Sequence, residues 1–319
     1  MIHLLFTGGT ISMRLDPAAG GNVPAHGGEA LVGFAPGLER VAPYRIENWA
    51  RLPACHFGPG RLWAMRERVR EIAQSGEADG IVVTHGTDTI EETAYLLDRT
   101  LEPGVPIAIT GAMRTSSDTE WDGPRNLVDA ATVAADPASR GCGTVVVFNG
   151  WVFAGRTAVK THATGVDAFA APHFEPIGRV AEGRVTLGRT DFGGRLPRSV
   201  VRPTGLGARV ALVPVVVGDE GRLLDLARAG HEGLVVEAFG SGNVPPGAVP
   251  AIGRWLDERK PVVLASRCPR GEVVPAYAFE GGGARLVAMG VLPAGPRTPS
   301  QARMELTIAL SAGVPYGTR

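Results

Sequence analysis

The chain has 319 residues, with Lys plus Arg equal to Asp plus Glu and a formal net charge of zero. This length predicts one large or two medium-sized α/β domains, and the charge balance does not favour binding to nucleic acid or to an anionic membrane surface. Cys55, Cys142 and Cys268 lie far apart, follow no metal-ligand spacing and are odd in number, which favours a reduced compartment. The N-terminus lacks a basic export segment and no apolar run approaches the roughly 20 residues of a membrane span, so we predict a cytoplasmic protein.

The first predicted element is a short buried strand that runs into a glycine turn. The apolar run at 2–6 is typical of a strand, and Gly8 and Gly9 allow the backbone to turn sharply after it. Thr10 is then displayed at the carboxyl end of the strand, the edge at which open α/β sheets bind ligands. A hydroxyl there, beside free backbone N–H groups, is suited to act as a nucleophile next to an oxyanion site. A strand-ending turn without chemistry is an alternative of equal weight.

The next segments are a glycine-rich stretch and a helix. Residues 12–33 contain three glycine clusters, Pro17 and Pro24, and little apolar periodicity, so we expect a long loop or loose hairpin near Thr10 and a candidate lid. From residue 61 the apolar residues recur at helical spacing, which predicts that one face of a helix is buried. These residues are Leu62, Met65, Val69 and Ile72.

Further strands and helices alternate up to residue 149. We predict strands at 80–84, 105–110 and 144–149, and helices over 90–101 and from about Pro124. With the segments before them, this makes five strand–turn–helix cycles, which are typical of a parallel sheet with helices on both faces. Residues 152–188 predict edge hairpins and irregular connections.

The composition then shifts, which predicts a domain boundary. We interpret residues 1–192 as an N-terminal catalytic α/β domain and the Gly-, Pro- and Arg-rich residues 193–207 as a linker. Residues 208–319 predict a smaller C-terminal α/β domain, with three strands, helical stretches at 223–229 and 248–258, and a final helix at 300–312. A glycine turn at 240–243 follows its second strand.

Two threonine-bearing turns therefore follow separate parallel strands. If both strands point the same way, Thr10 and the pair Thr87–Asp88 open onto one crevice. Lys160 is the natural partner of the Asp88 carboxylate, and a partly desolvated lysine can shuttle a proton for a neighbouring hydroxyl. Taken singly, the second turn is better explained as a helix N-cap, His85 as a structural histidine and Lys160 as a surface charge.

The combination of motifs resembles the bacterial-type L-asparaginase family, which includes glutaminase-asparaginases. The resemblance rests on segments that occur in the same order over nearly the whole chain: TGGTIS at the N-terminus, THGTDTIEETA at 84–94, ITGAMR at 109–114, DGPRNL at 122–127, VKT at 159–161 and FGSGNVP at 239–245. The first two together are highly specific, because each pairs a glycine turn with a threonine at a fixed distance from a strand.

The resemblance implies roles for the catalytic residues. Thr10 would attack a side-chain amide and release ammonia, while Thr87 and Asp88 would hold the substrate, Asp88 at its α-ammonium group. Thr87 and Lys160 would form the family's second threonine–lysine–acid constellation. Backbone N–H groups near Thr10 and Thr87 would donate to the oxyanion, and Gly9 and Gly86 would be among the substrate-binding residues.

The resemblance also implies a homodimer or homotetramer, with Asn243 near the active site of a neighbouring subunit. Two positions depart from the family pattern. The lid normally carries a tyrosine, but Asn22 stands about where that residue is expected. A serine that binds the substrate carboxylate is replaced by Cys55, which His56 follows and which is a weaker hydrogen-bond donor. A small buried hydrophobe is an equally weighted interpretation of Cys55.

The leading hypothesis is an asparaginase-type amidohydrolase with a Thr10 acyl-enzyme, a small-molecule amide substrate and no cofactor or metal. Its substrate is L-asparagine or another ω-amide such as glutamine. A non-catalytic amino-acid sensor that kept the pocket is the alternative from another class. A component of a tRNA amidotransferase would be expected to carry an additional N-terminal domain.

Overall fold

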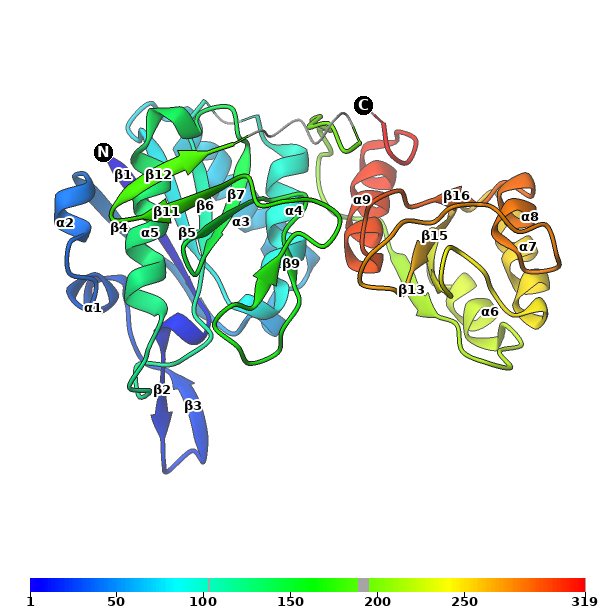
Figure 1. The fold of residues 1–319 in the computed structure, drawn as a ribbon, viewed down its shortest axis with the longest axis horizontal. Coiled ribbons are helices and arrows are strands. Elements are labelled where there is room, and N and C mark those ends of the chain that lie inside the picture. Colours follow the sequence, from blue (N-terminus) through cyan, green and yellow to red (C-terminus); the bar gives the residue numbers. More distant parts are fainter. Residues whose placement is uncertain (103, 189–194, 319) are drawn as a thin grey trace. The chain divides into compact units, whose positions relative to one another are not determined.

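The computed structural model describes residues 1–102, 104–188 and 195–318. The chain forms two compact units, Met1–Phe192 and Gly193–Arg319. Each unit is α/β and has its own main sheet, as the alternation of strands and helices predicted (Figure 1). No helix in the three described ranges is long and apolar enough to cross a bilayer.

The first unit is built on an eight-stranded sheet with the order β12-β11-β8-β7-β6-β5-β1-β4. Five neighbouring strands, β7, β6, β5, β1 and β4, are parallel, whereas β8, β11 and β12 are antiparallel and extend one edge. The sheet is therefore mostly parallel, with the predicted hairpins at its edge. The bounds are β1 Ile2–Gly8, β4 Tyr44–Leu52, β5 Gly80–Thr84, β6 Ile107–Thr110, β7 Thr144–Phe148, β8 Trp151–Ala154, β11 Gly178–Ala181 and β12 Arg184–Leu187.

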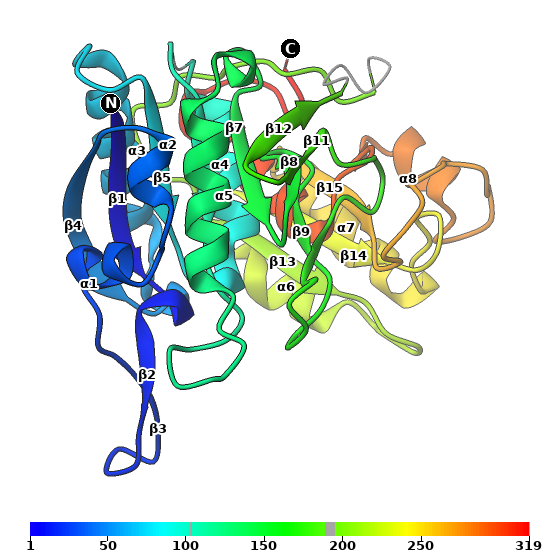
Figure 2. The same ribbon diagram turned by 60° about the vertical axis from the view of Figure 1, so that its left-hand side comes forward.

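Helices cover both faces of this sheet (Figure 2). α1 (Gly28–Gly33), α2 (Leu38–Val41) and α5 (Gly123–Ala135) pack on one face, and α3 (Pro59–Gln74) and α4 (Ile90–Thr100) pack on the other. The predicted apolar face of α3 is buried, because Leu62, Met65, Val69 and Ile72 are each at most 9% exposed. Burial of a whole face of this kind stabilises a helix more than its intrinsic propensity does.

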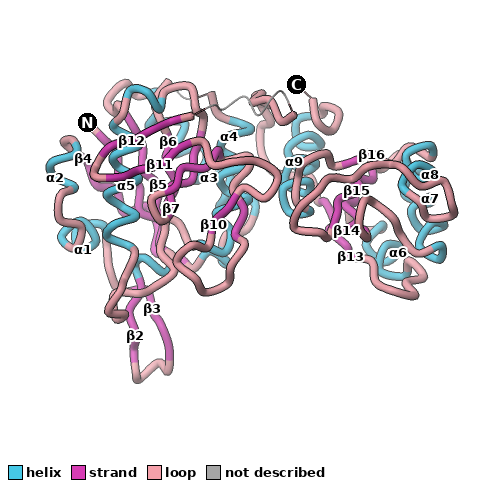
Figure 3. The backbone as a smooth tube through the Cα atoms, in the orientation of Figure 1, coloured by secondary structure: helices cyan, strands magenta, loops and turns pink. Residues whose placement is uncertain are grey.

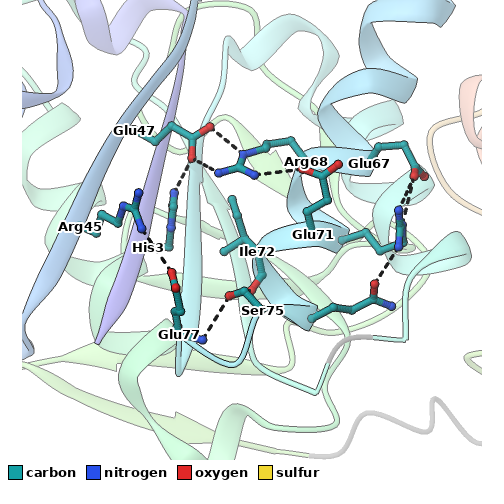
Figure 4. Close-up of polar contacts among 11 residues, drawn as sticks. His3, Arg45, Glu47, Glu67, Arg68, Glu71, Ile72, Ser75 and Glu77 are labelled. Carbon is teal, nitrogen blue, oxygen red and sulfur yellow. Dashed lines mark hydrogen bonds and ion pairs between the residues drawn. The ribbon is translucent and has the colours of Figure 1, made fainter.

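The edge strand β4 was missed by the sequence analysis. Its sequence, YRIENWARL, mixes polar and apolar residues, and its side chains are only partly buried. A network of hydrogen bonds and ion pairs connects β4 to β1 and α3 (Figure 4). His3 of β1 donates from Nε2 to Glu47 at 2.8 Å, and Arg68 of α3 donates from two nitrogens to the same carboxylate at 2.8 and 2.9 Å. Burial is the main reason that the pKa of His3 lies below its usual value.

Two small hairpins complete the first unit (Figure 3). β2 (Met13–Asp16) pairs with β3 (Gly21–Pro24), and β9 (Val159–Lys160) pairs with β10 (Phe169–Ala170). The predicted loose hairpin is thus present within residues 12–33, but that stretch also contains α1, which was not expected. The hairpin is also better anchored than its composition suggested, because Leu15 N–H donates to Ser117 and Ser116 N–H donates to the Met13 carbonyl.

The second unit has a four-stranded parallel sheet in the order β13-β14-β15-β16. One buried hydrophobic cluster lies between the sheet and the helices α6 and α7, and it includes Trp255. A second buried hydrophobic cluster lies between α9 and the opposite face of β13–β15. The bounds are β13 Val210–Pro214, α6 Arg222–Arg228, β14 Gly233–Ala238, α7 Val249–Asp257, β15 Val262–Ser266, α8 Gly283–Ala288, β16 Leu292–Pro293 and α9 Pro299–Ala312. α8 and β16 were not predicted. Part of the predicted linker, residues 193–194, lies outside the described residues, and 195–207 contain no helix or strand.

Candidate active site

The first threonine turn follows β1 directly and depends on its two glycines. Gly8 and Gly9 have φ angles of +112° and +87°, which side chains other than glycine rarely adopt. A Cβ atom on Gly9 would lie 2.5 Å from the Gly86 nitrogen and 2.8 Å from the His85 carbonyl carbon. This close approach of two backbones brings the turn after β1 against the turn after β5, as the parallel strand order predicted.

Backbone hydrogen bonds hold the first turn. Thr10–Ser12 form a short 3₁₀ helix, and Gly9 N–H donates to the Leu52 carbonyl at 3.0 Å. The buried Ser12 hydroxyl donates to Gly9 O at 2.8 Å, and the Ser12 carbonyl accepts two further N–H groups, from Ala25 and His26, at 2.9 Å each. Within the described residues, the Thr10 hydroxyl and the Thr10 N–H make no hydrogen bond. The turn is fixed while these two groups stay available.

The second turn is held by side chains. Thr87–Thr89 form a 3₁₀ helix after Gly86, and Thr87 is 5% exposed. Lys160 of β9 donates from Nζ to the Thr87 hydroxyl at 2.9 Å and to Asp88 Oδ1 at 2.7 Å. The Lys160 side chain is 17% exposed and the Asp88 side chain is 69% exposed. The structure therefore brings Thr87, Asp88 and Lys160 together across more than 70 positions of sequence, with the carboxylate open to solvent.

His85 supports the second turn from behind. The ring is fully buried, and Nδ1 donates to the Gly86 carbonyl at 2.9 Å. A neutral ring with this proton leaves Nε2 as the acceptor for the Thr93 hydroxyl, which lies 3.3 Å away. Burial lowers the pKa of His85 to about 4, so the ring is neutral at pH 7. His85 occupies a packed structural position, as the sequence analysis interpreted it.

The predicted carboxylate-binding pair lies beside the second turn. Ala54–His56 form a 3₁₀ helix, and a Cβ on Gly86 would lie 2.7 Å from the Ala54 Cβ. Cys55 and His56 are both exposed, which disfavours the interpretation of Cys55 as a buried hydrophobe.

The remaining two predicted positions lie in the second unit and in the β2–β3 hairpin. Asn243 belongs to the second unit, where its Oδ1 accepts the Gly283 N–H at 3.2 Å. Asn22 is exposed in the β2–β3 hairpin and pairs with Leu15. No group of three or more His, Cys, Asp or Glu residues suited to a metal ion occurs in the part of the chain that the structure describes.

The protein is thus a two-unit α/β protein whose first unit has hydroxyl, amine and carboxylate groups gathered at the turns that follow β1 and β5. Residues 1–192 match the model of the asparaginase N-terminal domain, and residues 209–316 match the glutaminase/asparaginase C-terminal domain. The chain belongs to the asparaginase family and is an amidohydrolase.

Individual relatives agree with this assignment. A probable L-asparaginase of Deinococcus radiodurans is 39% identical over 98% of this chain and 93% of its own length. A glutaminase-asparaginase of Pseudomonas aeruginosa is 31% identical over 86% of this chain and 77% of its own length. The crystal structure of a probable cytoplasmic L-asparaginase from Campylobacter jejuni superposes with a TM-score of 0.81 and 26% identity, covering 97% of this chain and 94% of that one.

Proposed function

We propose that this amidohydrolase converts L-asparagine to L-aspartate and ammonia through an acyl-enzyme on Thr10. The observation that supports the proposal is the close approach of Gly9 to Gly86, because the turn that carries Thr10 then adjoins the turn that carries the Thr87–Lys160–Asp88 cluster. A nucleophilic hydroxyl needs a nearby group that accepts its proton, and this cluster supplies a hydroxyl, an amine and a carboxylate.

The reaction then has two halves. The Thr10 oxygen bonds to the amide carbon and its proton passes into the cluster; the C–N bond breaks and the proton leaves with the nitrogen as ammonia. Water next attacks the ester, releases the free acid and returns a proton to Thr10. The N–H groups of Thr10 and Thr87 find no backbone acceptor within the described residues, so both are available to stabilise the tetrahedral oxyanion.

The substrate's charged groups have matching partners on the second turn. The exposed Asp88 carboxylate keeps one oxygen beyond its contact with Lys160 and would bind the α-ammonium group. Cys55 and His56, which adjoin Gly86, would bind the carboxylate. Because an O–H group donates a stronger hydrogen bond than S–H, Cys55→Ser should lower KM for L-asparagine. An unchanged KM, with equal thiol labelling of Cys55 in the presence and absence of substrate, would place this residue outside the pocket.

The assembly and location follow from the resemblance. We propose a homodimer or homotetramer in which Asn243 lies near a partner's site. A cytoplasmic location is supported by the description of the Campylobacter relative. Sedimentation at micromolar concentration tests the oligomer, and Asn243→Ala tests the shared site through its kcat.

The proposed reaction is tested by ammonia release from L-asparagine, D-asparagine and L-glutamine. Wild-type protein should prefer L-asparagine, and Thr10→Ala should remove most turnover. Thr132→Ala, which makes the same substitution on α5, is the matched control and should retain the wild-type rate. Full activity in Thr10→Ala would overturn the mechanism, and a preference for glutamine would assign the alternative substrate. Saturable binding of L-asparagine without turnover would assign the sensor function.

A further inference from the structure

A cavity lies beside the first threonine turn, and its lining includes none of the groups assigned to the reaction. Its volume is about 370 Å³, and its lining includes Gly8, Ser12, His26, Asn48, Arg51 and Thr84. Thr10, Thr87 and Lys160 are not among its lining residues. The cavity nevertheless touches residues on both sides of Thr10, because Gly8 precedes and Ser12 follows it.

A bulge in the edge strand creates this cavity. β1 and β4 pair in register from Ile2 with Tyr44 to Phe6 with Asn48, and pairing resumes only at Gly8 with Leu52. One residue of β1 therefore faces the three residues 49–51 of β4. Such bulges bend a strand and redirect its side chains. Here the bulge directs Ala50 and Arg51 to the cavity, and Gly8 has no Cβ that would obstruct β4.

Most neutral polar groups of the cavity are already engaged. The Ser12 hydroxyl donates to Gly9 O at 2.8 Å. Asn48 accepts from Gly28 N–H at 2.7 Å and donates to Glu29 at 2.9 Å. The Thr84 carbonyl accepts from the Thr7 hydroxyl at 2.7 Å. The groups of the cavity that are still available to bind a ligand are therefore mainly cationic.

Arg51 supplies most of the hydrogen-bond donors that are still available to a ligand. Its guanidinium group makes no hydrogen bond or ion pair within residues 1–102, 104–188 and 195–318. His26 is the second basic group, with Nε2 2.7 Å from the Ser116 hydroxyl. Because Ser116 donates its own proton to Met13 O, Nε2 of His26 is the donor in that contact. Burial is the main reason that the pKa of His26 lies below its usual value, and the positive charges of Arg14 and Arg51 lower it further.

We propose that this cavity binds a small anion of the carboxylate or phosphate type, with Arg51 as its principal ligand. A guanidinium group presents five N–H donors in a planar fork that matches these anions bidentately. The Glu29 carboxylate stands at the rim: a Cβ on Gly27 would lie 3.3 Å from Arg51 Nη2 and 3.5 Å from Glu29 Oε2. Glu29 is exposed, so solvent screens its repulsion of an anion without removing it.

Because Arg51 and Glu29 carry opposite charges, replacing each of them should change the anion affinity in opposite directions. Calorimetric titration of the full chain with succinate, and separately with inorganic phosphate, at constant ionic strength should show saturable binding by at least one. Arg51→Gln should weaken that binding about tenfold or more, since the bidentate charged contact is lost. Glu29→Gln should strengthen it by about two- to fivefold, because a screened repulsion is removed.

Three further variants test where and how the anion binds. Lys160→Met should leave anion affinity unchanged, which separates this cavity from the catalytic turns. Arg40→Gln removes a guanidinium group elsewhere on the first unit and should also have no effect. Arg51 is exposed, so its replacement should leave the fold intact, and Arg51→Lys should retain part of the affinity because it keeps the charge and loses the fork.

Three results would overturn the proposal: no saturable binding up to about 50 mM of either anion, where even a weak charge-assisted site would show; equal affinity in Arg51→Gln and wild type; or binding that is lost in Lys160→Met and kept in Arg51→Gln. The last result would place the anion at the catalytic turns. None of these outcomes depends on which amide the enzyme hydrolyses, so this proposal and the proposed function can fail separately.

Discussion

The two threonine turns solve the same positioning problem in different ways. The turn at 8–12 is held by positive-φ glycines and backbone hydrogen bonds, and its Thr10 hydroxyl contacts no hydrogen-bond partner among the residues that the structure describes. The turn at 84–89 has an extended Gly86 and is held by the contacts of Lys160 with Thr87 and Asp88. A turn that is held by backbone hydrogen bonds leaves its side-chain hydroxyl available for reaction. A turn that is held by side-chain contacts has its charged groups in position before the substrate binds. Four predictions test this difference.

The largest effect is expected where the two turns touch. Gly9→Ala would force a side chain onto a residue with φ +87° and against the Gly86 nitrogen at 2.5 Å. Because misplacing reacting groups by about 1 Å costs about 10²-fold, and strain is added here, we expect kcat to fall by about 10²–10³-fold. Gly20→Ala is the matched control, with φ +70° and open space around its Cβ. Similar losses in the two variants would show that backbone strain alone, without the contact, is responsible.

Breaking the second turn's side-chain contacts should cost slightly less. We expect Lys160→Met to lower kcat about 10²-fold or more, since the Thr87 hydroxyl and the Asp88 carboxylate lose their shared partner. Thr87→Ala and Asp88→Ala should show losses of the same order. Lys260→Met, which removes the chain's other lysine, should retain wild-type kcat. A wild-type rate in Lys160→Met would show that Lys160 is only a surface charge with no part in the reaction.

His85 should make the stability of the first unit depend on pH. Its pKa is depressed to about 4 in the folded state and is about 6.5 when unfolded, so the unfolded chain binds the proton more tightly. The associated stability is fully present above pH 6.5 and is lost as the pH falls toward 4, by on the order of 3 kcal/mol. Chemical denaturation from pH 7.5 to 4 should show this decline, with a weaker slope in His85→Gln. Identical slopes would exclude His85 as its cause.

The smallest effect is expected within the turn at 8–12. Ser12→Ala removes the hydroxyl that donates to Gly9 O at 2.8 Å, but the Ser12 N–H to Gly9 O bond at 3.0 Å remains. We expect a loss of about 1 kcal/mol in the free energy of unfolding and a change of only a few-fold in kcat. A loss as large as that of Lys160→Met would show that the turn depends on a side chain after all.

Local sequence patterns were sufficient to predict much of the secondary structure of the first unit. The apolar face of α3, the buried strands β5 and β7 and the glycine turn after β1 all follow from periodicity and backbone freedom, which are properties of short segments. β4 was missed because its residues are only partly buried and a bulge interrupts its pairing, so the period-2 pattern is blurred. α1, α2, α8 and β16 are too short, or too rich in glycine, for a periodic signal.

The sequence by itself determined that two threonine turns follow two buried strands and that a lysine and a carboxylate are available to them. Only the tertiary structure decided which atoms meet, because the Gly9–Gly86 contact and the Lys160–Thr87 hydrogen bond each span more than 70 residues. It also decided that the base of the β2–β3 hairpin is anchored, and that the bulge in β4 opens a cavity beside Arg51. Contacts between segments far apart in the chain depend on sheet order and packing, and no local pattern of residues encodes them.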